Sequence, residues 1–363
     1  MSSQSLVTNL RIVGAIATKD ITQALRNKHS VSLIITALIV VVGYHFLPLL
    51  SEAGEPPYVL IYDAGDSALL PLLEASPALR VFEYDSQARM EFLLTDAETP
   101  ELGLTLPEDF DARLAAGVTP ELTGHVLHWV SEDSIERLQQ AVEGEIAAAL
   151  GVVVPIRISE QRVYPTAESG GISVMVGMAF VYVVMLIGLM VPPHLMMEEK
   201  QAHTLDALLV SPATPSQIVL GKAASGLAYA VAGGALALLI NQAMVIHWGV
   251  AIAAAFGGAL FGTAVGLLLG SLLQVRQQLM LWAWVVFIPL FIPMIAALLA
   301  DVLPAPVVAV ARWVPSTVLL NLVRAALAAR IAPAHWVGPL IYLFGTSSAV
   351  LAFVAWTVRR SDR

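Results

Sequence analysis

The polar residues best suited to binding lie between 197 and 222, in a stretch that separates two long apolar runs. A charged start and a leucine stripe at helical spacing define it: Glu198, Glu199, Lys200, Leu205, Leu208 and Leu209. Pro212 and Pro215 are expected to end this helix, because proline lacks an amide donor and clashes with the preceding turn. The pattern predicts an amphipathic helix at a membrane surface. Its leucines either rest among lipid headgroups or enter a groove on a partner protein.

The lysine at the end of this stretch does not belong to a phosphate-binding loop. Such a loop needs Gly-x-x-x-x-Gly-Lys followed by serine or threonine, whereas Gly221-Lys222 is followed by Ala223 and lacks the upstream glycine. The chain also has no His-Glu-x-x-His motif and no Ser/His/Asp order with an elbow motif. We therefore expect no catalytic site and no cofactor here, with any ATP and magnesium held by a separate subunit.

Two histidines, His125 and His128, are the candidates for a metal site. The residues around them predict a β-strand, in which side chains three positions apart face opposite sides of the sheet. A metal ion shared by these two residues is therefore not expected.

The stretch 197–222 resembles the cytoplasmic loop of type 2 ABC exporter permeases, where E-x-(x)-G-T-L-E-x-L-L-V-T-P, a spacer and G-K recur. The matching residues are Glu199, Thr204, Leu205, Leu208, Leu209, Pro212, Gly221 and Lys222. His203 stands where that family commonly has glycine, and Asp206 replaces the usual glutamate. In that family this helix docks on the ATP-binding subunit. The resemblance therefore implies that 194–222 is a cytoplasmic coupling loop, with Glu198 and Lys200 among its contact residues.

The composition predicts an integral membrane protein. Hydrophobic residues make up 57% of the 363-residue chain, charged residues 13%, and the mean hydropathy is +0.76. A soluble domain is closer to 45–50% apolar and about 25% charged. The chain has no cysteine, which excludes disulfides and thiol-based metal or redox chemistry.

Charge separates an acidic insertion from the rest of the chain. Residues 51–170 hold 22 acidic and six basic residues, against six acidic and 13 basic elsewhere. Strands are predicted at 58–63, 79–84, 101–106, 122–130 and 152–158. Helices are predicted at 68–74, 88–94, 110–116 and 133–150, the last capped by Gly151. This alternation predicts a small α/β domain over residues 51–171.

The apolar runs predict a membrane all-α domain of six transmembrane helices, into which the α/β domain is inserted. Each run is long enough to cross a hydrocarbon layer of ~30 Å: 31–50, 172–191, 223–246, 250–273, 279–300 and 336–358. Residues 1–30 predict an interfacial amphipathic helix whose apolar face includes Leu10, Ala17 and Leu25. Proline-broken helices at the outer interface are expected over 301–334, and a cytoplasmic tail over 359–363.

Four glycines on the fourth predicted span recur at every fourth position. They are Gly258, Gly262, Gly266 and Gly270. Such a row removes side chains from one helix face and lets another helix approach closely. The partner helix belongs either to the same chain or to a second subunit across a dimer seam.

Basic residues predict the orientation. With the N-terminus inside, short cytoplasmic segments carry ten lysines and arginines and short outer segments carry three. Both termini are therefore expected in the cytoplasm of a prokaryote, with the chain in the plasma (inner) membrane and the acidic domain extracytoplasmic.

Two functions remain open on the sequence alone. The resemblance implies an exporter permease that works as a homodimer, or paired with a related permease, with ABC ATP-binding subunits. The alternative is a non-transporting sensor or scaffold of the cell envelope. Charged residues are absent from the interiors of the six predicted spans, which argues against ion antiport and favours a lipophilic substrate. Membrane lipid is an expected partner and nucleic acid is not.

Overall fold

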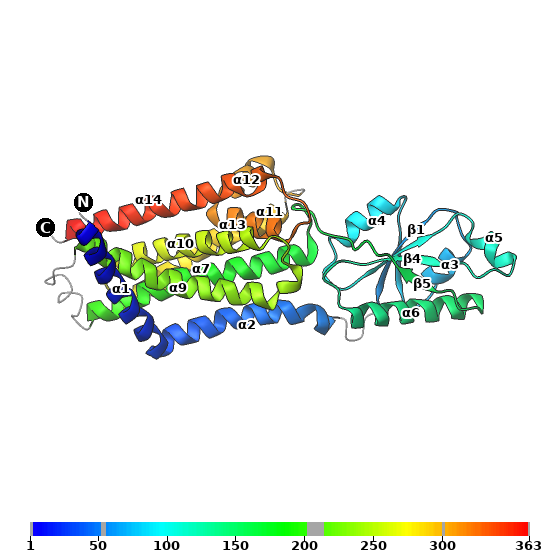
Figure 1. Cartoon of the computed structure of the whole chain (residues 1–363), viewed down its shortest axis with the longest axis horizontal. Coiled ribbons are helices and arrows are strands. Elements are labelled where there is room, and N and C mark those ends of the chain that lie inside the picture. The colour runs from blue at the N-terminus through cyan, green and yellow to red at the C-terminus, as the bar shows by residue number, and fades with distance from the viewer. Residues whose placement is uncertain (1–2, 52–55, 202–213, 300–301, 362–363) are drawn as a thin grey trace. The chain divides into compact units, whose positions relative to one another are not determined.

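The computed structural model describes residues 3–51, 56–201, 214–299 and 302–361. They form two compact units (Figure 1). The helical unit comprises Met1–Gly43, Val176–Ala326 and Ile331–Arg363, and the α/β unit comprises Tyr44–Met175 and Leu327–Arg330.

The chain begins with two helices, α1 (Ser3–Arg26) and α2 (Lys28–Ser51), and residues 9–26 and 30–46 of this pair are bent by 75°. The face that α1 buries against α9 is centred on Ile16, Asp20 and Ala24. Leu10 and Leu25 are exposed, at 71% and 62%. Ala17 of the predicted apolar face is buried, at 9%, and the placement of α1 at a membrane interface stays a prediction.

Helix α7 (Gly171–Gln201) is the most buried of the long apolar helices. It runs straight past Pro192 and Pro193, where the sequence predicted its end. Neighbouring helices make room for the two prolines with glycine. A Cβ on Gly226 would lie 2.5 Å from Pro192 Cγ, and one on Gly270 would lie 3.0 Å from Pro193 Cα. Packing by neighbours is what allows proline inside such a helix.

Helix α9 (Pro215–Ile240) begins eight residues before the predicted span. The Thr214 side chain accepts from the Gln217 amide, and the Gln217 side chain accepts from the Thr214 amide, which completes a capping box. Pro215 occupies the first turn, where its missing N–H costs no hydrogen bond. Pro215 therefore starts a helix, and residues 215–222 lie on α9. Because residues 194–201 lie on α7, the predicted loop 194–222 is too long at both ends.

The glycine row lies on α10 (Trp248–Leu272) and faces helices of the same chain. A Cβ on Gly262 would meet Gly188 Cα of α7 at 3.4 Å, and one on Gly266 would meet the Gly188 carbonyl oxygen at 2.6 Å. Gly258 instead faces Leu319. The glycines therefore bring α10 into close contact with α7 within one chain.

The remaining helices complete the helical unit: η1 (Gln242–Met244), α11 (Arg276–Leu298), α12 (Ala305–Ala311), α13 (Pro315–Leu327), η2 (Pro333–His335) and α14 (Val337–Ser361). Helices α12 and α13 are bent by 80° relative to each other. Among the described residues, five helices are long and apolar enough to cross a membrane, or up to seven if each bent pair is one span. The six-span count therefore stays a prediction.

The α/β unit contains a five-stranded sheet of order β2-β1-β3-β4-β5. Its strands are β1 (Tyr58–Asp63), β2 (Arg80–Glu83), β3 (Leu102–Leu106), β4 (Leu122–His125) and β5 (Ile156–Ile158). Strand β1 runs parallel to β2 and β3, β4 is antiparallel to β3, and β5 is parallel to β4. Strand β4 ends at His125, five residues before its predicted end, and β5 starts four residues later than predicted.

The helices of this unit are α3 (Leu69–Glu74), α4 (Gln87–Leu94), α5 (Phe110–Ala115) and α6 (Glu132–Leu150). The larger apolar core joins the sheet to α3 and α6, and a smaller one joins Leu60 to α4 through Met90 and Leu94. Gly151 ends α6 in the left-handed conformation at φ 72°, as predicted.

Candidate coupling site between α1, α7 and α9

Residues 202–213 connect α7 to α9 and lie outside the described residues. Five residues that match the permease pattern fall there, namely Thr204, Leu205, Leu208, Leu209 and Pro212. Glu199 and Lys200 lie on the last turns of α7. The geometry of the candidate site is therefore that of the two helix ends on either side of 202–213.

Helix α1 crosses this end of the helical unit, where the N-terminus and C-terminus also lie (Figure 1). It packs directly on α9. A Cβ on Gly221 would lie 2.6 Å from Ile16 Cγ2 and 3.3 Å from the Val13 carbonyl oxygen. Gly221 therefore allows the backbones of α1 and α9 to approach each other, which is why a glycine is needed at this position.

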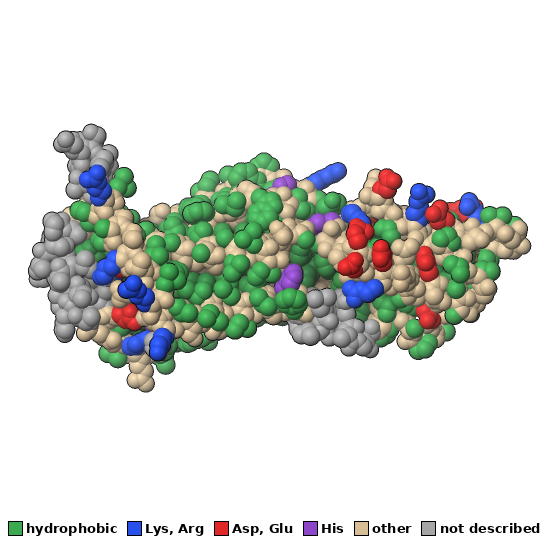
Figure 2. All heavy atoms as spheres, turned by 60° about the horizontal axis from the view of Figure 1, so that its bottom comes forward, with side chains coloured by type: hydrophobic (Ala, Val, Ile, Leu, Met, Phe, Trp, Pro, Cys, Tyr) green, Lys and Arg blue, Asp and Glu red, His purple; other side chains and the backbone are tan. Residues whose placement is uncertain are grey.

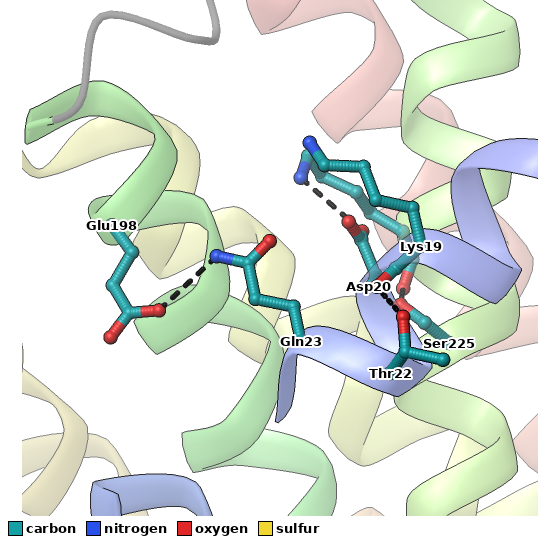
Figure 3. Close-up of polar contacts among 7 residues, drawn as sticks. Lys19, Asp20, Thr22, Gln23, Glu198 and Ser225 are labelled. Carbon is teal, nitrogen blue, oxygen red and sulfur yellow. Dashed lines mark hydrogen bonds and ion pairs between the residues drawn. The ribbon is translucent and has the colours of Figure 1, made fainter. Parts of the chain in front are cut away.

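A buried ion pair joins the two helices one residue further on. Lys222 Nζ lies 3.4 Å from Asp20 Oδ2, and the two side chains are only 3% and 2% exposed. Ser225 lies beside Asp20 (Figure 3) and donates its hydroxyl to the Lys222 carbonyl oxygen at 2.9 Å. Removing one partner of a buried pair leaves an uncompensated charge in an apolar environment and typically costs about 3–5 kcal/mol. This pair therefore holds α1 against α9.

A second contact joins α1 to the end of α7. Gln23 donates to a Glu198 carboxylate oxygen at 3.3 Å, as Figure 3 shows. Asn27, just after α1, donates to the other oxygen of the same carboxylate. Hydrogen bonds to a charged acceptor are about twice as strong as neutral ones. Glu198 thus attaches the last turns of α7 to the end of α1.

Two further contacts run along α9. Asn9 accepts a hydrogen bond of 2.7 Å from Gln217, a residue of the α9 capping box. Tyr229 donates its hydroxyl to the Ile21 carbonyl oxygen. Helix α1 is therefore attached to both helices that flank 202–213, and at several points to α9.

Two residues that were predicted to contact a partner are buried within the chain. Gly221 and Lys222 lie inside α9 rather than in a loop, and both are buried against α1. Their side of α9 is therefore covered by the chain itself. The reason is the early start of α9 at its proline and capping box, which places both residues on a helix face that α1 covers.

The sequence did not point to several residues of this site, namely Asn9, Asp20, Gln23, Asn27, Ser225 and Tyr229. One sequence signal could have found Asp20: it is the only acidic residue in 1–30, among four cations. Asp20 and Lys222 are far apart in sequence, and neither position alone predicts a pair. The contacts that the structure describes here attach helices to one another.

His125 and His128 have separate surroundings. His125 Nδ1 lies 3.4 Å from Glu91 Oε1, and Nε2 lies 3.1 Å from the Thr105 hydroxyl. Burial lowers the pKa of His125, and the nearby Glu91 carboxylate opposes this shift. The His128 ring instead stacks on Tyr164 with centroids 4.7 Å apart. Among the residues that the structure describes, no group of three or more His, Cys, Asp or Glu could hold a metal ion.

Comparison with known proteins places the chain in a family. A family model described as ABC-2 family transporter protein matches residues 30–356, which include the α/β unit and most of the helical unit. A comparison with curated proteins gives no match. The long apolar helices fit the membrane-spanning part of such a transporter. This chain belongs to the ABC-2 transporter family, and it is a multi-pass membrane permease.

Proposed function

We propose that this chain is the membrane-spanning subunit of an ATP-driven exporter and works as a dimer with separate ATP-binding subunits. Membership of the ABC-2 family implies an ATP-binding partner. The observation that carries the finer proposal is that α1 is attached to the helices on both sides of 202–213, through Asp20–Lys222 and Gln23–Glu198. A displacement of 202–213 by a partner would therefore move α7, α9 and α1 together.

The packing of α7 supports the proposal that a displacement of 202–213 is passed to the other helices. Helix α7 is the most buried of the long apolar helices, and its Gly188 lies against Gly262 and Gly266 of α10 with almost no side chain between the backbones. Movement at the end of α7 would therefore reach the centre of the helical unit. Backbones that approach this closely transmit displacement because little flexible side chain separates them.

The charges of α1 support a cytoplasmic position for this end. Arg11, Lys19 and Arg26 on α1, and Lys28 at the start of α2, are all exposed. Figure 2 shows Lys and Arg gathered over this end of the helical unit, and the adjacent visible face carries many hydrophobic side chains among backbone and other atoms. An excess of cations marks the cytoplasmic side of membrane proteins. Burial of Lys222 beside Asp20 leaves little net charge between the helices, which favours a lipophilic substrate.

The experiment that tests this proposal changes the leucine stripe of 202–213. A variant with Leu208→Ala and Leu209→Ala, reconstituted in vesicles with the ATP-binding subunit, should insert normally but no longer co-purify with that subunit or stimulate its hydrolysis. Burying one leucine is worth roughly 1.5–3 kcal/mol, so losing two anchors weakens the complex by several kcal/mol. Leu239→Ala, an exposed leucine at the other end of α9, is the matched control.

Two results would contradict the proposal. If the double variant co-purifies and transports like the parent, 202–213 is not the docking element. If the parent chain itself neither binds an ATP-binding subunit nor moves an apolar dye outward, the chain is a sensor or scaffold rather than an exporter.

A further inference from the structure

The α/β unit contains a cavity of about 670 Å³ at the amino ends of β1 and β3. This volume falls in the range of about 300–1,000 Å³ that is common for small-molecule sites. Its lining includes Tyr58, Leu60, Phe82, Tyr84, Leu93 and Glu101. The cavity lies within one unit and involves none of the contacts that attach α1 to α7 and α9.

One wall of the cavity is aromatic. Leu60 pairs with Phe82 in the parallel ladder, and the period of two places Tyr58 and Tyr84 on the same face of the sheet. The rings of Tyr58 and Phe82 are nearly parallel, at 6°, with centroids 6.1 Å apart. Phe82 is 46% exposed, whereas its ladder partner Leu60 is only 4% exposed. Both rings line the cavity, but the Arg80 guanidinium donates to the Tyr58 hydroxyl and lies over the Tyr58 ring, 5.1 Å from its centroid, so Phe82 offers the available apolar surface.

A carboxylate lies beside this wall. Val59 pairs with Leu102, so the same register continued by one residue places Glu101 next to Tyr58. Among the described residues, no hydrogen bond or ion pair is made by Glu101. Burial and the neighbouring Glu98 raise the pKa of Glu101 to about 7. Glu101 is thus a partly buried acid that lacks a cation.

The basic residue of the lining does not neutralise Glu101. Arg137 donates through Nη2 to the Ser134 hydroxyl at 3.0 Å and through Nε to the Asp133 carbonyl oxygen at 3.3 Å. Its guanidinium group is therefore engaged with its own helix, α6. Asp96, another acidic residue of the lining, accepts a hydrogen bond from the Gly170 amide at 2.6 Å. Glu98 and Glu101 are the carboxylates left to meet a ligand.

At the carboxyl ends of the parallel strands, the polar groups already bind other groups of the same chain. In α/β sheets, ligands usually bind beyond the carboxyl ends of parallel strands. Here Asp63, at the end of β1, accepts from the amides of Gly65 and Ser67 at 3.0 and 2.6 Å. Asp111 accepts from the Ser67 hydroxyl at 2.7 Å and from the Ala68 amide at 3.0 Å. Asp63 and Asp111 therefore already have hydrogen-bond partners at the carboxyl ends of the strands. The cavity at the amino ends is left as the candidate ligand site.

We propose that this cavity binds a small amphipathic organic cation, with a flat apolar body against Phe82 and an ammonium group beside Glu101 and Glu98. Aromatic faces attract cations through the ring quadrupole, and a partly desolvated carboxylate provides the opposite charge. The same reasoning excludes organic anions, because two carboxylates would repel them. This ligand site goes beyond the permease role and requires nothing of the ATP-binding partner.

The cavity also has a structural link to the start of α7. The loop that lines it contains Asp96 and Ala97, and the Ala97 carbonyl oxygen accepts from the Ile172 amide at 2.9 Å. Gly171 has a φ of 53°, and a Cβ there would lie 2.3 Å from the Asp96 carbonyl oxygen. A bound cation would therefore contact the same loop that holds the first residues of α7.

The test measures binding to the full chain in nanodiscs of phosphatidylcholine, a lipid without net charge. Calorimetric titration with benzyltrimethylammonium should show saturable binding at one site per chain, whereas the anion phenylmethanesulfonate should not bind. Glu101→Gln, which keeps the side-chain shape, should weaken cation binding at least tenfold. Glu74→Gln, an exposed glutamate on α3, should leave binding unchanged.

The pH dependence gives a second readout. Benzyltrimethylammonium keeps its charge at every pH, so its affinity should rise between pH 6 and pH 8 as Glu101 loses its proton. Glu101→Gln should reduce this rise, while Phe82→Ala should weaken binding at both pH values. Three results would overturn the proposal: no saturable binding to the parent chain, equal affinity of the parent and Glu101→Gln chains, or equal affinity for the anion.

Discussion

The two units treat buried charge in opposite ways. In the helical unit, Lys222 and Asp20 are almost completely buried and lie against each other. In the α/β unit, Glu101 is partly buried, lies near Glu98, and has no described cation beside it. A paired charge fixes the position of a helix, whereas a carboxylate without a cation is available to bind one. The difference separates a positioning site from a ligand site, and neutralising a charge should therefore have opposite effects on stability in the two units.

The largest effect is expected from breaking the pair in the helical unit. Lys222→Met removes the ammonium 3.4 Å from Asp20 and should lower the free energy of unfolding by about 3–5 kcal/mol. Thermal unfolding of the detergent-solubilised chain measures this loss. Lys28→Met, an exposed cation at the start of α2, is the matched control and should change stability by less than about 1 kcal/mol.

The double variant Asp20→Asn with Lys222→Met sharpens this prediction. With both charges gone, the helices should recover a large part of the lost stability, because no uncompensated buried charge remains. If the double variant is as unstable as the sum of the two single variants, the pair contributes no coupling energy and α1 is held by its other contacts with α7 and α9.

A smaller effect is expected where α7 meets α10, a contact made without charge. Gly266→Ala places a methyl group 2.6 Å from the Gly188 carbonyl oxygen and should cost about 1–3 kcal/mol through a forced backbone shift. Gly257→Ala on the same helix meets its nearest atom at 3.7 Å, which is ordinary contact. That control should be neutral or stabilise by up to about 1 kcal/mol, because alanine favours helix. Equal melting temperatures for the two variants would show that α7 and α10 can move apart without loss of stability.

The smallest effect, with the opposite sign, is expected in the α/β unit. The pKa of Glu101 is about 7 in the folded chain against 4.5 for the isolated group, so the folded state holds a proton that the unfolded state releases. Stability should therefore fall as pH rises from about 4.5 to 7, and level off above that. The residue is partly solvated, which limits the loss to about 1 kcal/mol. Glu101→Gln should remove this pH dependence and be more stable than the parent at pH 8.

Pulse proteolysis of residues 58–158 in the full chain, across a urea series at pH 5 and pH 8, measures this difference. Glu74→Gln provides the matched control and should keep the parent's pH dependence. If Glu101→Gln destabilises the unit at pH 8, the carboxylate has a stabilising partner in the folded chain and is not free for a ligand.

Local sequence patterns were sufficient to predict many of the strand and helix boundaries in the α/β unit. The strand at Tyr58–Asp63 begins and ends where its apolar residues predict, and α6 ends at Gly151 as the capping rule predicts. These features depend on neighbours a few residues away, such as the left-handed conformation that glycine adopts readily. The same holds for the glycine row on α10, whose spacing predicts a close-packed face. Within the described residues that face lies against α7 of the same chain, a choice that the spacing leaves open.

In the membrane helices, some features could not be predicted from neighbouring residues. The predicted span ends at 191, yet α7 continues through Pro192 and Pro193, beside which Gly226 and Gly270 on other helices make room. Lys222 was assigned to a loop, and its burial depends on an aspartate about 200 positions earlier in the chain.

The sequence by itself therefore established the membrane class, the acidic insertion, most of its strands and helices, and the permease-like stretch. The pairing of Asp20 with Lys222, the attachment of Glu198 to α1, and the cavity beside Glu101 depend on contacts between distant segments. Such contacts follow from the packing of whole helices and sheets, and no window of neighbouring residues contains them.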